Sequence, residues 1–201
     1  MAVEGLVDSV IYLGGCNLTG YSHSFDASYG AEMVDDTKMN DTTRTSYPGL
    51  KTFSFTVSGF QNYTDLSSSL FDQINTTEVA LSFAPGSSTA ESNRAFAVRG
   101  VSATYMPISG NVGDLLPFEL NGNATNSLVR GEIGAIGAKT ATGNGTGSQI
   151  GALSAVQTMH LAQHITAVSG TTPTLDTTIE SDDNSGFSSA TTQITIEQQT
   201  A

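Results

Sequence analysis

The sequence is short of several residue types, and each shortage excludes a class of protein. It has a single cysteine, Cys16, no tryptophan, and only 7 Lys and Arg among 201 residues. One cysteine cannot build an intramolecular disulfide framework, so the core must hold without covalent crosslinks. So few cations exclude a protein that works by neutralising nucleic-acid phosphates, and they argue against docking on anionic membranes.

Long apolar segments are also missing. No stretch approaches the ~20 apolar residues of a membrane-spanning helix. The first residues, Met-Ala-Val-Glu-Gly, lack the basic flank and the apolar stretch of a secretory signal. We therefore expect no membrane partner.

Acidic residues are plentiful by contrast. The 19 Asp and Glu residues give the chain a formal net charge of -12. One interpretation is solubility, because net charge keeps copies of a protein apart. The other is a surface that must not stick to nucleic acid. Composition leaves both interpretations open, since it does not show where the acids lie.

Two short motifs bear on metal binding, and neither has the full pattern. His160 and His164 are four residues apart, but the zinc-protease motif requires Glu directly after the first His, and a leucine stands there. Residues 181–186 resemble the start of a calcium loop, yet the twelfth position is the neutral Gln193 instead of a bidentate Glu. We expect both histidines to face solvent from a strand and residues 181–186 to form a turn.

Motifs for catalysis do not stand out either. The Gly-rich run that starts at Gly143 is not followed by the Lys-Ser or Lys-Thr pair of a phosphate-binding loop. Cys16 has no nearby basic residue in the sequence to stabilise a thiolate, and we find neither a nucleophile elbow nor paired carboxylates. We expect a protein that is not an enzyme, with no catalytic residue, no cofactor and no bound metal.

Hydrophobic periodicity predicts a mainly β protein. Residues 51–60 alternate most clearly, with Phe53, Phe55 and Val57 on one face and Ser or Thr on the other. Turn signals recur about every ten residues, which is typical of sandwiches and barrels. Weaker runs predict further strands at 10–13, 24–29, 78–83, 95–106, 115–120, 128–136, 159–167, 175–179 and 194–196.

One segment has helical periodicity instead. Residues 64–74 place four apolar side chains on one face, and Thr64 is a suitable N-cap. A helix this short is stable only when its apolar face packs on a sheet. The expected core of sheet and helix contains Phe53, Phe55, Val57, Leu66, Leu70 and Phe71.

Two segments show no sustained period. Residues 31–50 are long for a loop in a compact domain, and such loops are usually functional or disordered. Arg44 and Tyr47 within it are residue types enriched at protein interfaces, although a plain connecting loop is the alternative. The composition of residues 139–149 predicts a flexible loop.

Three stretches, in this order and spacing, carry a family resemblance. The first is Glu-Met-Val-Asp-Asp-Thr from Glu32, continuing through Arg44 and a Tyr-Pro-Gly-Leu-Lys turn into the strand at 53–60. The second is 98–120, with Val-Gly-Asp-Leu-Leu-Pro-Phe inside it. The third is 168–187, followed by an Ile-Thr-Ile strand. Together they resemble the major tail tube protein of long-tailed, siphovirus-like bacteriophages and related gene transfer particles, except that Phe-Gln-Asn-Tyr replaces the family's commoner aromatic-Asp pair before the helix.

The resemblance implies a β-sandwich or small barrel flanked by one helix, in a single tail tube domain over residues 1–201. Subunits of the family join into rings, usually of six, and the rings stack into a tube through which DNA is ejected. A long loop reaches the neighbouring ring, and residues 31–50 match it. The implied inter-ring contacts are Asp35, Asp36, Lys38, Asp41, Arg44, Tyr47 and Pro48.

The implied partners are copies of the same chain, a tape-measure protein inside the tube, and tail terminator and baseplate proteins. DNA would pass transiently without sticking, which favours the second interpretation of the acidity. The protein would be assembled in the host cytoplasm and reside in the tail of the virion. Alternatives are a head decoration protein, a tail fibre domain, or a secreted carbohydrate-binding β-sandwich, which the lack of Trp disfavours.

Overall fold

The computed structural model describes residues 9–62, 64, 66–74, 79–86, 91–107, 109–143, 154, 156–184 and 186–200. These ranges contain ten strands and one helix. In chain order they are β1 (Val10–Leu13), β2 (Cys16–Asn17), β3 (Ser22–Asp35), β4 (Ser46–Phe60), α1 (Ser67–Ile74), β5 (Val79–Ala84), β6 (Arg94–Met106), β7 (Pro117–Ala124), β8 (Val129–Glu132), β9 (Thr174–Ser181) and β10 (Thr191–Thr200). The prediction of a mainly β fold with one flanking helix is confirmed.

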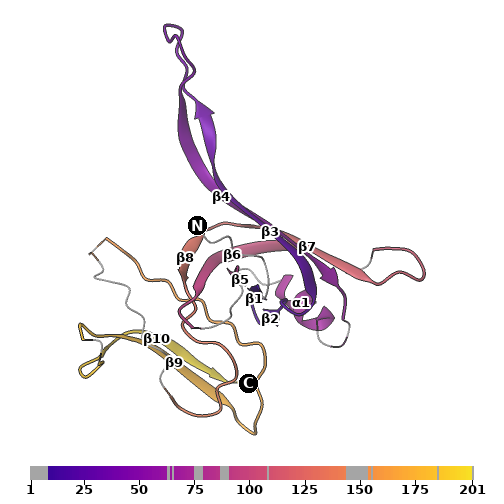
Figure 1. Ribbon diagram of the computed structural model, residues 1–201, viewed down its shortest axis with the longest axis vertical. Coiled ribbons are helices and arrows are strands. Elements are labelled where there is room, and N and C mark those ends of the chain that lie inside the picture. The colour runs from indigo at the N-terminus through magenta and orange to yellow at the C-terminus, as the bar shows by residue number, and fades with distance from the viewer. Residues whose placement is uncertain are drawn as a thin grey trace.

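The strands form two antiparallel sheets (Figure 1). The larger sheet has the order β2-β1-β5-β6-β7-β4-β3, and β8 pairs with the start of β6 beside this path. The sheet curls strongly, and this curl brings Phe25 of β3 against Phe83 of β5, with ring centroids 4.8 Å apart. The end strands β3 and β2 do not pair, so the sheet stays open and is not a closed barrel. The smaller sheet contains β9 and β10.

The core lies on the inner side of the curled sheet. Phe53, Phe55 and Val57 of β4 are at most 3 % exposed, as their alternation predicts. Leu66 and Leu70 are equally buried and attach the helix to this core. Phe71, by contrast, is 62 % exposed, so its predicted place in the core is wrong. The reason is geometric: the next residue of a helix points about 100° away from the buried stripe.

Several predicted boundaries shift by a few residues. The helix begins at Ser67 instead of residue 64, because the backbone first makes a turn in which the Leu66 amide donates to the Asn62 carbonyl (3.0 Å). Strand β7 runs from Pro117 to Ala124, and β8 is limited to Val129–Glu132. Of the predicted flexible loop, residues 139–143 have no regular structure and the rest lies outside the described residues.

Half of the segment 31–50, predicted as an aperiodic loop, is strand: residues 31–35 and 46–50. Strands β3 and β4 form one long hairpin whose register continues to the pair Asp35 and Ser46, and residues 36–45 are its tip. All residues of this segment are exposed. A strand that buries neither face needs no apolar alternation, so its sequence carries no period-two signal.

The predicted strand 159–167 is also wrong, since this segment has no regular structure. It lies against the larger sheet through His164, whose Nδ1 is 2.7 Å from the Gly14 carbonyl oxygen and whose Nε2 is 2.7 Å from the Ser82 hydroxyl. The imidazole also stacks on Tyr12, with ring centroids 5.5 Å apart. His160 is exposed as predicted, whereas His164 is partly buried.

The protonation of His164 follows from these contacts. A carbonyl can only accept, so Nδ1–H donates to Gly14, and the hydroxyl of Ser82 donates to an unprotonated Nε2. Burial lowers the pKa of His164, and the hydrogen bond to Gly14 only partly offsets this. The native state therefore holds the neutral imidazole.

We expect Gly59→Ala to destabilise the protein by about 3 kcal/mol, because a methyl group at residue 59 would overlap the Tyr21 carbonyl oxygen and lie 2.6 Å from the Phe118 ring. Gly30→Ala on the paired strand is the matched control, since a methyl group there meets nothing within 4 Å. It should change stability by no more than about 0.5 kcal/mol. Urea unfolding measures both, and equal effects of the two substitutions would contradict the close approach at Gly59.

We also expect acid to weaken the native state through His164. Because folding lowers the pKa of this group, the unfolded chain takes up the proton first, and stability falls as the pH drops below about 6.5. His164→Gln should remove that part of the pH dependence, whereas His160→Gln, which removes an exposed imidazole from the same segment, should retain it. The measurement is the free energy of unfolding in urea at pH 7.5 and 5.5. Identical pH dependence in wild type and His164→Gln would refute the assignment.

Candidate functional site

The β3–β4 hairpin leaves the body of the protein as a projecting arm. Pairing of β4 with β7 begins at Phe53, opposite Ala124, so residues 46–52 bond to β3 alone. We call residues 31–52 the arm. It extends well beyond the curled sheet along the long axis of the molecule (Figure 1).

The arm carries apolar side chains that nothing covers. Register places Met33 opposite Pro48 and Val34 opposite Tyr47. Tyr47 is 68 % exposed and Leu50 is 81 % exposed. A two-stranded ribbon has no second layer, so both of its faces meet water. Exposed apolar side chains that lie together in this way mark a surface that another molecule covers.

The tip of the arm is ordered by its own hydrogen bonds. The Lys38 amide donates to the Asp41 carboxylate (2.8 Å), and the Asp41 amide donates back to the Lys38 carbonyl (3.0 Å). Across the tip, the Thr45 hydroxyl donates to the Asp36 carbonyl (3.0 Å) and the Asp36 amide donates to the Thr45 carbonyl (2.9 Å). The tip is therefore a defined shape although it is fully exposed.

Charges on the arm are balanced locally. Arg44 Nε lies 3.7 Å from Asp35, and Lys38 Nζ lies 3.9 Å from Asp36. Exposed pairs of this kind contribute little to stability, because solvent and salt screen them. The Thr37 hydroxyl and the Thr37 amide both donate to the Asp35 carboxylate, and these bonds hold the pKa of Asp35 below its ordinary value.

All the residues predicted for the inter-ring interface lie on the arm. Asp35 ends β3, Tyr47 and Pro48 lie near the start of β4, and the others form the tip. Sequence reasoning missed Met33 and Leu50, which are among the most exposed apolar residues of the arm. The sequence did offer a signal for them: both are apolar residues in a segment without the apolar alternation of a core strand. The predicted residues, placed on the arm, are Asp35, Asp36, Lys38, Asp41, Arg44, Tyr47 and Pro48.

A second surface is the side of the larger sheet that faces away from the core and from α1. Here four neighbouring strands align polar residues in cross-strand rows. We call this surface the polar face. Its residues are Asp26 and Ser28 of β3, Ser54, Thr56 and Ser58 of β4, Glu119, Asn121 and Asn123 of β7, and Ser102 and Thr104 of β6.

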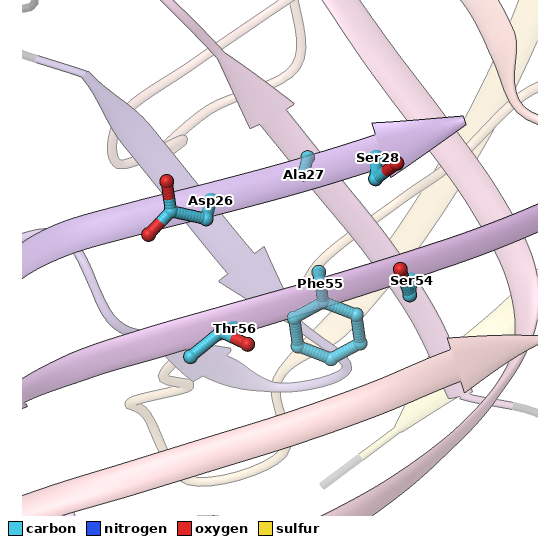
Figure 2. A pocket seen from close by; sticks show the side chains of 6 residues that line it. All are labelled: Asp26, Ala27, Ser28, Ser54, Phe55 and Thr56. Carbon is cyan, nitrogen blue, oxygen red and sulfur yellow. The ribbon is translucent and has the colours of Figure 1, made fainter. Parts of the chain in front are cut away.

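The polar face contains two carboxylates and no cation. Its groups bond to one another across strands: the Thr56 hydroxyl donates to Asn121 (2.7 Å), and the Asn121 amide donates to Glu119 (2.5 Å). A shallow open depression of about 280 Å³ lies where β3 and β4 run side by side, lined by Asp26, Ala27, Ser28, Ser54, Phe55 and Thr56 (Figure 2). An open depression on a strand pair is a surface feature and not a ligand cavity.

Both surfaces are exposed to contact with other molecules. In the part of the chain that the structure describes, no three His, Cys, Asp or Glu side chains gather closely enough to hold a metal ion. The helix found among the described residues is too short and too polar to cross a membrane.

Comparison with known proteins gives matches to solved structures. No protein-family model and no curated protein matches the sequence. One match is a chain of the sheath–tube complex of an extracellular contractile injection system, PVC, in the extended state, with a TM-score of 0.50 and 12 % identity over 65 % of this chain and 93 % of that chain. Another is the tube-terminating cap of the anti-feeding prophage, with a TM-score of 0.47 and 10 % identity over 66 % of this chain and 95 % of that chain. The first match shows a shared fold.

We expect the Asp35 carboxyl to titrate below its ordinary range in the wild type, because the Thr37 hydroxyl and amide stabilise the anion. Thr37→Val removes the hydroxyl, which contributes most, and should raise the pKa of Asp35. Thr43→Val on the same tip should leave it unchanged. Carbon-detected NMR titration measures all three proteins, and an unchanged Asp35 in Thr37→Val would contradict the tip structure.

Proposed function

We propose that this protein is a structural subunit that assembles with copies of itself into the tube of a phage-like tail or injection particle. In its most specific form the proposal is a phage tail tube of stacked rings, usually of six subunits, through which DNA is ejected. The observation that carries it is the arm, a long ordered hairpin whose apolar side chains are uncovered in the single chain. The fold shared with a chain of a sheath–tube complex supports it.

In this proposal the arm joins one ring to the next. Met33, Tyr47 and Leu50 supply apolar area, and the charged tip supplies directional contacts from Asp36, Lys38, Asp41 and Arg44. Buried apolar contacts with a polar rim are the usual anatomy of a protein interface. Asp35 and Thr37 hold the tip in shape.

Ring closure is supported by the open sheet. Strand β3 pairs with β4 on one side, and its other side has no partner among the described strands. Unpaired strand edges are satisfied when identical subunits meet around a closed ring. An exposed edge of this length would otherwise invite irregular aggregation.

The polar face is proposed to line the channel. Its hydroxyl and amide groups already bond to one another, and Asp26 and Glu119 would repel a passing phosphate backbone. Sliding requires that no cation forms a lasting phosphate contact. This assigns two of the 19 acids to the bore and supports the interpretation of acidity as a non-stick surface.

The proposed partners are copies of this chain, a tape-measure protein within the tube, and terminator and baseplate proteins at its ends, in a virion tail assembled in the host cytoplasm. A head decoration protein or tail fibre domain is the second candidate. Such proteins form trimers or spikes. The exposed apolar side chains on the projecting arm favour the tube instead, because stacked rings would cover them.

Excising the arm tests the stacking role. Replacing residues 31–51 by Asn-Gly joins Gly30 to Thr52, which are directly paired, through a two-residue hairpin turn. We expect tubes to be lost in negative-stain electron microscopy, while the free energy of unfolding changes by less than about 1 kcal/mol because the arm holds no core residue. Thr42→Ala with Thr43→Ala, on the exposed tip, is the control and should still form tubes. Long tubes from the excised variant would defeat the proposal.

Thiol accessibility tests the channel assignment. Ser102→Cys places a thiol on the polar face, and Phe71→Cys places one on the exposed side of α1 across the sheet. Assembly should slow the labelling of residue 102 by a bulky polyethylene-glycol maleimide about tenfold or more. The labelling rate of residue 71 should stay unchanged. The native Cys16 does not compete, since burial raises the pKa of its thiol to about 11. Equal labelling of Ser102→Cys in tubes and free subunits would place the polar face elsewhere.

A further inference from the structure

The charges of this protein are separated along the chain. All 7 cations lie in described residues: three on the arm, and the others at Arg94, Arg99, Arg130 and Lys139. From residue 140 to the end there is no Lys or Arg at all. The cations outside the arm therefore lie between residues 94 and 139, whereas the charged side chains after residue 140 are all acidic apart from the histidines.

The positive part surrounds β8. Register places Arg94 of β6 opposite Glu132 and places Arg130 of β8 opposite Phe96, so the two arginines lie close together on one face. Both arginines are exposed. Lys139 adds a third cation, 3.8 Å from Glu91. Two carboxylates lie among these three cations, Glu132 opposite Arg94 and Glu91 beside Lys139, so the group carries a net charge of +1 (three cations less two anions). We call Arg94, Arg130 and Lys139 the cationic edge. Strand β8 pairs with β6 alone among the described strands, so its other side is open.

The negative part is the β9–β10 hairpin. Asp176, Glu180 and Glu197 are exposed on one face of it, and Leu175, Ile179, Ile194 and Ile196 lie half-buried on the other. Among the described strands, β9 and β10 pair only with each other. The polar contact found on the acidic face is a hydrogen bond from Gln198 to Asp176 (3.0 Å). A two-stranded sheet is marginally stable by itself, so this hairpin gains from a partner.

We propose that the acidic face of the β9–β10 hairpin docks on the cationic edge of a second copy of this chain. The charges are complementary, both surfaces are exposed, and each copy carries one of each, so the contact runs head to tail and can continue around a ring. The ring itself rests on the proposed function, whereas the pairwise contact does not. It is separate from the arm, which serves the neighbouring ring.

Charge reversal with mixing tests the contact. One full-length variant carries Arg94→Glu with Arg130→Glu, and the other carries Glu180→Lys with Glu197→Lys. Each alone should associate at least about tenfold more weakly than wild type in sedimentation velocity at low salt, because like charges then face each other. An equimolar mixture should regain association, since each variant's hairpin is complementary to the other's edge. Arg94→Lys with Arg130→Lys is the charge-preserving control and should resemble wild type.

The outcomes separate the two proposals. Recovery on mixing supports a contact between copies. Failure to recover overturns it, and if a chain carrying all four reversals then behaves as wild type, the hairpin docks on its own chain instead. Wild-type association of either reversed variant also overturns it. If mixing restores association but no tubes form, the contact between copies is supported and the proposed tube is overturned. If both reversed variants form tubes as well as wild type does, the tube is supported and this contact is overturned.

Discussion

The rest of the structure depends on how β4 is bonded along its length. From Phe53 onward it is paired on both sides, with β3 and β7, and its alternate residues are buried in the core. Before Phe53 it is paired with β3 alone and is exposed. One continuous strand therefore passes from the core into the arm. The buried half anchors the exposed half, and a register shift between Ala31 and Met33 lies where the arm begins.

The two-residue period of a strand gives the same sheet two different surfaces. Residues that point inward pack in the hydrophobic core beside α1, and residues that point outward form the polar face. Close packing on the inner side requires glycine where neighbours approach: a side chain at Gly122 would collide with the Phe55 ring.

Sequence reasoning succeeded where one face of an element is buried. Phe53, Phe55 and Val57 could be placed because burial on one side imposes alternation. It failed for residues 31–35 and 46–50, where no face is buried, and for 159–167, where His164 replaces a strand ladder by two side-chain hydrogen bonds. The residues predicted for the inter-ring interface were named through the family resemblance, apart from Arg44 and Tyr47, whose residue types are enriched at interfaces. The polar face could not be found, because it depends on the register between β4 and β7, which lie far apart in the chain.

The self-bonded tip has a consequence for how copies come together. Since Asp36, Lys38, Asp41 and Thr45 already hold it in one shape, little conformational freedom is left to lose when it meets a neighbour. In the proposed tube, each engagement would therefore cost little entropy. Several arms acting together would raise the local concentration of the next contact and would hold firmly as a group. A misplaced copy held by one arm would dissociate, while a complete ring would persist.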